Sequence, residues 1–270
     1  MKNNFAKEIN TPWRLVSTAI YGPPVDGKIY GTFEVDVTKA VEYIKEQRTK
    51  GNKITMTHVI SSALARSLAE DAPEINCYVK RGRLIPRETV DVAVPVNIRG
   101  GSEMSIAIIK SADKKTLSEI SEEIRLKAAD SRQGHEEKSM KNKYTLSKVP
   151  WPFRRWVFLL LRFIAYELGI KIGGLSENTF GSIVLSNIGT HGLTTGMPAL
   201  FPAAKVPAVV VMGKEEEKPV VRDGEIVIRS ILPLTATMDH RILDGGMAGK
   251  LARGISKRIQ HPESLDEPGF

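Results

Sequence analysis

The stretch Thr237-Met238-Asp239-His240-Arg241-Ile242-Leu243-Asp244-Gly245 determines how the rest of this chain is interpreted. The apolar run that leads into it, Ile231 to Met238, predicts a strand, and apolar residues spaced four apart over 247–259 predict a helix. His240 therefore stands at a strand end, where the backbone is fixed while the side chain can project into a cleft. With an ordinary pKa of about 6.5, such a histidine suits proton removal from a thiol or hydroxyl near neutral pH.

The same nine residues also permit a purely structural interpretation. Asp244 stands where the N-cap of the following helix is expected, and His240 can be an ordinary residue at the end of a sheet. Taken alone, the stretch favours this structural interpretation over a catalytic one.

Strand-like and helix-like segments are mixed along the rest of the chain. Helices are predicted after Val37, over Thr57–Leu68 and around Leu117–Ile124, with Asp36 or Thr38 as the cap of the first. Strands are predicted at 31–37, 90–98, 104–109, 180–188, 206–212 and 225–234, with a hairpin over 77–86 that turns at Arg81-Gly82 and a further turn at 222–224. This mixture predicts an α/β fold, a two-layer sandwich with a mixed sheet. No linker or internal repeat is found, so residues 1–270 are expected to form a single domain.

The charge, the cysteine count and the N-terminal residues bear on which classes of function are expected. The chain has 39 basic and 31 acidic residues, a net charge of +8, which favours anionic partners. The basic residues are spread out and no nucleic-acid-binding motif is found, so nucleic-acid binding rests on charge alone and is not expected. Cys77 is the single cysteine, which excludes an internal disulfide and is interpreted as a buried structural residue. The first ten residues lack the apolar run of a signal peptide, so a cytoplasmic protein is expected.

The other histidines give little support to metal or hydrolase chemistry. His58, His135, His191 and His261 have no obvious chemical companions, and no two histidines have helical i, i+4 spacing. Without a His-Glu-x-x-His pattern, no metal site is expected. No Gly-x-Ser-x-Gly elbow occurs either, which argues against a serine hydrolase.

One segment stands out by composition. Residues 131–148 are polar and charged and are the best candidate for a mobile loop, whereas Val149–Tyr166 is rich in aromatic and aliphatic residues with interspersed arginines. Its longest uncharged stretch is far shorter than the ~20 residues that span a bilayer. Two interpretations stay open: a helix packed against the body or another subunit, which is favoured, and an interfacial membrane helix.

The nine-residue stretch resembles the Asp-His-Arg-x-x-Asp-Gly signature of the dihydrolipoamide acyltransferases of 2-oxo acid dehydrogenase complexes. Chloramphenicol acetyltransferases have a related His-x-x-x-Asp-Gly. Further stretches are similar to the same superfamily in the same order, from about Trp13 to Leu265: Phe33–Thr38, Val90–Val96, Ser111–Ile120 and Val184–Gly189. The resemblance implies the fold of chloramphenicol acetyltransferase and a trimeric, coenzyme-A-dependent acyltransferase.

The resemblance also implies roles for four residues. His240 matches the general base that takes a proton from the acceptor thiol or hydroxyl, which then attacks the thioester of acyl-coenzyme A. Ser186 matches the hydrogen-bond donor to the tetrahedral oxyanion, supplied across a subunit interface. Asp244 matches the position that supports the histidine, and Arg14 is assigned as its supporting partner.

The chain also departs from the family's full-length enzymes. No lipoyl or subunit-binding domain is found, so we expect no covalently bound lipoyl group here and membership of a dehydrogenase complex stays open. The acceptor can be a separate lipoylated protein, another carrier thiol, or a small alcohol or amine. The part at about 131–171 is interpreted as an insertion that shapes a pocket or packs the trimer. The alternative function is a non-catalytic trimeric scaffold, or a homologue that binds a membrane or a partner through this segment.

Overall fold

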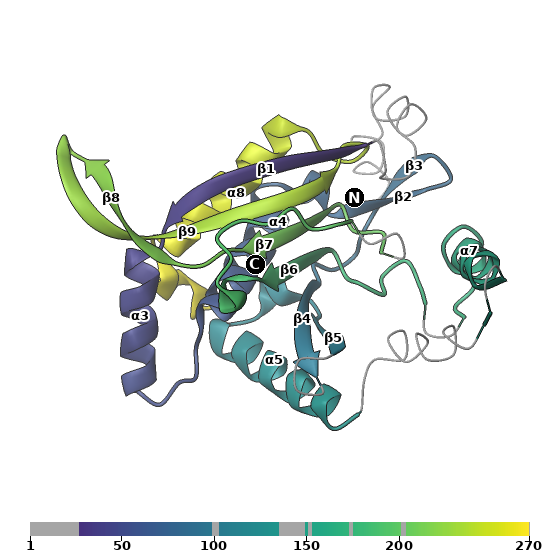
Figure 1. The fold of residues 1–270 in the computed structure, drawn as a ribbon, viewed down its shortest axis with the longest axis horizontal. Helices are drawn as coiled ribbons and strands as arrows, with labels where there is room; N and C mark the ends of the chain where they lie inside the picture. Colours follow the sequence, from purple (N-terminus) through teal and green to yellow (C-terminus); the bar gives the residue numbers. More distant parts are fainter. Residues whose placement is uncertain are drawn as a thin grey trace.

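The computed structural model describes residues 27–98, 103–134, 149–150, 153–172, 175–200 and 204–269. Within these residues, seven strands form one mixed sheet in the order β1-β9-β7-β6-β4-β5, and β8 pairs with β9 beyond this path (Figure 1). The pairs β4–β6 and β6–β7 are parallel and the others antiparallel. The strands are β1 (Lys28–Asp36), β4 (Val92–Ile98), β5 (Glu103–Ile109), β6 (Ile183–Asn187), β7 (Ala208–Met212), β8 (Glu216–Arg222) and β9 (Glu225–Asp239). A separate hairpin joins β2 (Cys77–Lys80) to β3 (Arg83–Pro86).

Of the α-helices in the described part of the chain, four pack into a layer with this sheet and one stands apart from them (Figure 1). The layer consists of α3 (Thr38–Thr49), α4 (Met56–Glu70), α5 (Leu117–Arg132) and α8 (Gly245–Ile259). The separate helix is α7 (Phe153–Tyr166). Short 3-10 turns occur at Pro73–Ile75, Ala112–Lys114, Gly189–His191 and Pro262–Leu265.

Alternation along the central strands divides the buried side chains between the two faces of the sheet. Ile183 and Leu185 of β6 face the helical layer and belong to the large core. Val184 instead packs with a smaller cluster that includes Phe158 of α7. We call this second side the outer face of the sheet. Ser186 follows Val184 at the period of two and therefore also belongs to the outer face.

Most elements predicted from periodicity are present, and the predicted α/β sandwich with a mixed sheet is confirmed. Arg81 and Gly82 both have positive φ values, 48° and 72°, as the predicted hairpin turn requires. The predicted strands 225–234 and 231–238 form one continuous strand, β9. The N-cap of α3 is Val37 and not Asp36 or Thr38; the Asp36 carboxylate instead accepts a hydrogen bond from the N–H of Thr38 (3.1 Å). Most of the predicted loop, 135–148, lies outside the described residues.

His58 has a structural role that gives the fold a pH dependence. It is buried in the first turn of α4, where its Nδ1 accepts a hydrogen bond from the N–H of Thr55 (3.2 Å). Burial lowers the pKa of His58 to about 4. In the unfolded chain a histidine takes up its proton near pH 6.5, so this residue stabilises the fold above that pH and loses the contribution as the pH falls toward 4.

We therefore expect the free energy of unfolding to fall by about 2 kcal/mol between pH 7.5 and pH 5 through His58 alone. Denaturant unfolding at a series of pH values measures this change. His58→Gln is the matched variant, because it removes the titrating group while keeping a side chain that accepts a hydrogen bond. Equal pH slopes for wild type and variant between pH 6.5 and pH 4 would show that His58 is not the source.

Candidate functional site

His240 occupies the tight turn between β9 and α8. Its backbone N–H donates to the carbonyl oxygen of Gly27 (2.8 Å), and its half-buried ring places Nδ1 2.9 Å from the carbonyl oxygen of Leu243. A carbonyl oxygen can only accept a hydrogen bond, so in the neutral ring Nδ1 carries the proton and Nε2 keeps its lone pair. The turn therefore holds His240 in the tautomer that a general base at Nε2 requires.

The two residues beside His240 form an ion pair that fixes the strand end. The Asp239 carboxylate is buried, at 3% exposure, and the Arg241 guanidinium donates to it from Nη2 (2.6 Å) and from Nε (2.9 and 3.1 Å). The backbone N–H of Arg241 also donates to Asp239 (3.1 Å). A bidentate, charge-assisted pair of this kind is among the stronger hydrogen-bonding contacts in proteins. It joins the residue before His240 to the residue after it and so fixes the turn.

Asp244 is the N-cap of α8. Its Oδ1 accepts a hydrogen bond from the backbone N–H of Met247 (3.0 Å), as the structural interpretation of the sequence predicts. Ile242 and Leu243, between the histidine and this cap, are buried in the core. Asp244 thus fixes the start of the helix on which the His240 turn depends.

Ser186 lies near the end of β6, which runs in the opposite direction to β9, whereas His240 directly follows the end of β9. Ser186 is in register with Val211 of β7, which is in register with Thr235 of β9, and His240 is five residues beyond Thr235, directly after β9. At about 3.3 Å per residue and 4.8 Å per strand, the two Cα atoms are about 19 Å apart. One copy of the chain therefore does not bring Ser186 and His240 together.

Of the remaining sequence candidates, two are described by the structure and two are not. Arg14 and His135 lie outside the described residues. His191 and His261 are exposed on other parts of the surface. Among the described residues there is no group of three or more His, Cys, Asp or Glu side chains that could hold a metal ion.

A cavity of about 620 Å³ lies between α7, the β2–β3 hairpin and the end of β9. Asp239, Arg241 and Ile242 bring the His240 turn to its wall. Its other lining residues are Val79, Arg81, Gly82, Arg155, Phe158, Leu159, Arg162, Tyr166, Glu167, Leu200, Ala204, Lys205 and Val206. The lining combines aliphatic and aromatic side chains with more cationic than anionic ones, which suits an amphiphilic anion.

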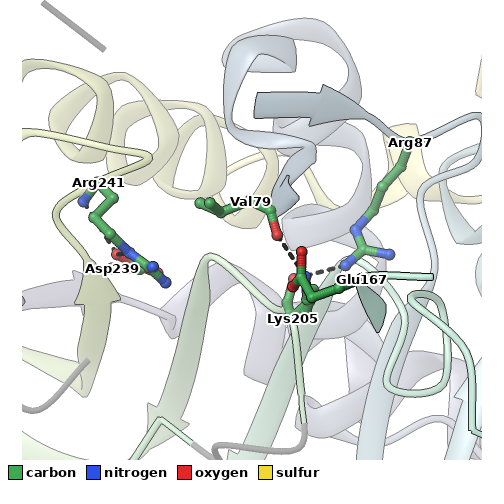
Figure 2. Close-up of polar contacts among 6 residues, drawn as sticks. All are labelled: Val79, Arg87, Glu167, Lys205, Asp239 and Arg241. Atoms are coloured by element: carbon green, nitrogen blue, oxygen red, sulfur yellow. Dashed lines mark hydrogen bonds and ion pairs between the residues drawn. The ribbon is translucent and has the colours of Figure 1, made fainter. Parts of the chain in front are cut away.

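Charged side chains beside this cavity contact residues that are far away in the sequence. Lys205 Nζ donates to the Glu167 carboxylate (2.7 Å) and to the carbonyl oxygen of Val79 (2.7 Å), and Arg87 donates to the carbonyl oxygen of Lys205 (2.7 Å) (Figure 2). Burial by itself would raise the pKa of Glu167, but the hydrogen bond and charge of Lys205 outweigh it and lower that pKa. Burial lowers the pKa of Lys205. Glu167 is therefore held as a carboxylate beside the cavity.

Sequence reasoning did not identify the cavity residues Glu167 and Lys205. They are 38 residues apart and belong to no motif, so only the packing of α7 against the segment before β7 reveals the pair. Lys205 also lies over the ring of Tyr166, 5.5 Å from its centroid, and burial raises the pKa of Tyr166 to about 12.

The family model for the catalytic domain of 2-oxoacid dehydrogenase acyltransferases matches residues 27–146 and 173–266. The chain is 23% identical over 239 residues to the dihydrolipoyllysine-residue acetyltransferase component of the acetoin cleaving system of Bacillus subtilis (strain 168). It is 25% identical over 239 residues to the corresponding component of the pyruvate dehydrogenase complex of the same organism. These alignments cover 87% and 86% of this chain and 50% and 44% of the relatives, so the chain spans about half the length of the relatives it matches.

Solved structures show the same fold. A probable dihydrolipoamide acetyltransferase from Listeria monocytogenes 4b F2365 aligns with a TM-score of 0.65 at 21% identity, over 92% of this chain and 88% of that one. A chloramphenicol acetyltransferase aligns with a TM-score of 0.54 at 15% identity, over 93% and 97% of the two chains. The fold resemblance predicted from the sequence is therefore confirmed. Because the family model matches most of its length, the chain belongs to the family of catalytic domains of 2-oxoacid dehydrogenase acyltransferases.

Proposed function

We propose that this chain is the catalytic domain of a coenzyme-A-dependent acyltransferase, which moves an acyl group between acyl-coenzyme A and a thiol or hydroxyl acceptor. The observation that carries the proposal is the geometry of His240, whose Nδ1 is occupied by the carbonyl oxygen of Leu243 so that Nε2 keeps its lone pair. In a family of acyltransferases, a histidine held in this way suits the role of general base.

In the proposed reaction, Nε2 of His240 takes the proton of the acceptor S–H or O–H as the acceptor atom attacks the thioester carbonyl carbon. The new bond to the acceptor forms, and the carbonyl oxygen becomes an oxyanion. When this tetrahedral intermediate collapses, the carbon–sulfur bond to coenzyme A breaks. The leaving thiolate then takes the proton back from the His240 imidazolium, so that the enzyme is regenerated.

Ser186 is proposed to donate a hydrogen bond to that oxyanion. Because Ser186 and His240 are about 19 Å apart in one chain, the proposal requires that they come from two subunits, as the predicted trimer provides. Asp244 contributes by capping α8 and thereby positioning the His240 turn. Arg14 stays a predicted supporting partner of Asp244.

The proposed substrates follow from the relatives and from charge. Two relatives are named as dihydrolipoyllysine-residue acetyltransferase components, so a lipoyl-like dithiol on a separate carrier protein is the first acceptor to test. Coenzyme A contains several phosphate groups, which suits a chain with a net charge of +8. We propose that residues 1–270 act as one catalytic domain without a lipoyl group or metal of their own, in the cytoplasm.

Release of free coenzyme A thiol from a panel of acyl-coenzyme A thioesters tests this function. Dihydrolipoamide, other thiols and small alcohols and amines serve as acceptors. We expect acceptor-dependent thiol release with at least one pair. No release with any combination, from protein shown to be folded and trimeric, would overturn the proposal.

Ser186→Ala is expected to lower kcat by about 10²- to 10³-fold, because it removes a donor aimed at the developing oxyanion. KM for acyl-coenzyme A should change little, since the donor acts on charge that the ground state lacks. Steady-state kinetics with the best acceptor measures both constants. Thr190→Ala, at an exposed residue shortly after β6, is the matched hydroxyl deletion and should keep kcat near the wild-type value. An unchanged kcat for Ser186→Ala would remove Ser186 from the proposed site.

The alternative, a non-catalytic trimeric scaffold, is favoured by one observation, the exposed apolar side of α7. Such a scaffold would release no thiol with any acceptor while it still forms trimers. The acyltransferase assay and a measurement of oligomeric state therefore separate the two functions.

A further inference from the structure

Helix α7 has an exposed apolar face. Phe153, Trp156, Leu160 and Phe163 are 62%, 68%, 58% and 53% exposed. At 100° per residue their spacing places all four within about 80° of the helix circumference. We call these four residues the outward face of α7. Side chains of this size are normally buried, so a continuous patch of them indicates a surface that contacts something else.

The opposite side of the helix is attached to the body of the protein. Phe158 packs against the hydrophobic cluster on the outer face of the sheet, and Ala165 and Tyr166 are buried. Figure 1 shows α7 at one end of the molecule, away from the helical layer. The helix is therefore anchored along one side while its outward face points away from the protein.

Charge indicates which kind of surface the outward face contacts. Between Glu137 and Glu167 the sequence has seven basic residues and no acidic one: Lys138, Lys141, Lys143, Lys148, Arg154, Arg155 and Arg162. Since the whole chain has a net charge of +8, the rest of it has a net charge of +1. The excess of positive charge is thus concentrated in the segment that contains α7. Aromatic and leucine side chains on one face, with basic residues elsewhere in the same segment, are typical of a helix that lies in the surface of an anionic membrane.

The comparison with the family supports a separate role for this segment. The family model matches up to residue 146 and again from residue 173, so all of α7 lies in the unmatched part. The fold shared with the family therefore does not depend on this helix. None of the helices in the described part of the chain has the length and hydropathy needed to cross a bilayer, which limits contact through α7 to the membrane surface.

We propose that α7 docks this protein on an anionic lipid surface, with Phe153, Trp156, Leu160 and Phe163 inserted at the level of the headgroups. The net positive charge of the same segment favours negatively charged lipids. This binding is independent of acyl transfer and rests on no catalytic residue.

Co-sedimentation of the full chain with vesicles tests the proposal. Vesicles of phosphatidylcholine mixed with phosphatidylglycerol are compared with vesicles of phosphatidylcholine alone, at low and at high salt. We expect about tenfold or greater preference for the anionic vesicles, and weaker binding as salt rises. Trp156→Glu/Phe163→Glu should lower the binding at least about tenfold, because it places two carboxylates in the outward face.

Val221→Glu/Ile226→Glu is the matched control. It makes the same change in charge at two apolar side chains that are 64% and 78% exposed in the β8–β9 hairpin, far from α7, and should bind vesicles like wild type (Figure 1). Thermal unfolding and light scattering of all variants check the fold and the oligomeric state. The proposal is overturned if wild type ignores anionic vesicles, binds both kinds equally, or loses binding equally in both double variants. It is also overturned if Trp156→Glu/Phe163→Glu splits the oligomer, because the outward face then contacts a second copy of the chain.

Discussion

Acyl transfer by the His240→Ala variant is expected to be about 10²- to 10⁴-fold slower than wild type in kcat, the range that general-base catalysis contributes. The alanine has no atom at the position of Nε2, so the acceptor thiol must lose its proton to water. The fold should be kept, because the backbone N–H that donates to Gly27 is unchanged and the ring is half exposed. Thiol release under saturating substrate, with thermal unfolding in parallel, measures both effects.

His261→Ala is the matched control for that variant. His261 lies near the C-terminus on the surface, where its ring contacts the exposed Glu263 carboxylate (3.3 Å), and no proposed step uses it. We expect wild-type kcat from it. If His240→Ala retains wild-type kcat, or if the two alanine variants lose activity equally, His240 is not the general base.

The main architecture could be predicted because it depends on local periodicity. The need to bury particular side chains sets the apolar pattern, such as the continuous run over 206–212 and the spacing of four over 247–259. The first pattern predicts a strand of the sheet and the second predicts α8. The Arg81-Gly82 turn could be predicted for a similar reason, since positive φ at two successive residues needs a turn sequence of this kind.

The arrangement around His240 could also be predicted in part from consecutive residues. Its ring hydrogen bond to Leu243 and the Asp244 cap on the N–H of Met247 both span three residues, so a short run of consecutive residues contains both contacts. The ion pair between Asp239 and Arg241 likewise joins side chains two residues apart. Contacts between residues this close in the sequence can be predicted without knowing how distant segments pack.

Other features depend on contacts between distant segments. The Lys205–Glu167 pair and the cavity beside it exist only because α7 packs near the hairpin and the end of β9. The sequence left open whether Val149–Tyr166 is packed or interfacial, and the structure shows why. One side of α7 is buried and the other is exposed, and an apolar pattern alone does not distinguish burial inside the protein from contact with another surface.

The distance between Ser186 and His240 leads to the prediction that most directly tests a shared site. If each site combines His240 of one subunit with Ser186 of its neighbour, two inactive variants can repair each other. An equimolar mixture of His240→Ala and Ser186→Ala subunits, assembled at random, should contain about one intact site in four. The mixture should therefore recover about a quarter of wild-type kcat, from two preparations that are each at least about a hundredfold impaired.

Co-expression of the two variants at equal levels, with different affinity tags that report the subunit ratio, provides the randomly assembled oligomers without selection, and thiol release measures their activity. The matched control is the His240→Ala/Ser186→Ala double variant co-expressed with wild type. There, each wild-type subunit supplies both groups, so about a quarter of the sites are again intact if neighbours share them, but half if each subunit is complete in itself. The two mixtures therefore give equal activity only under the shared arrangement. If each site lay inside a single subunit, a rearrangement would have to bring Ser186 and His240 together across the about 19 Å that separates them in one chain. The mixture of single variants would then stay inactive.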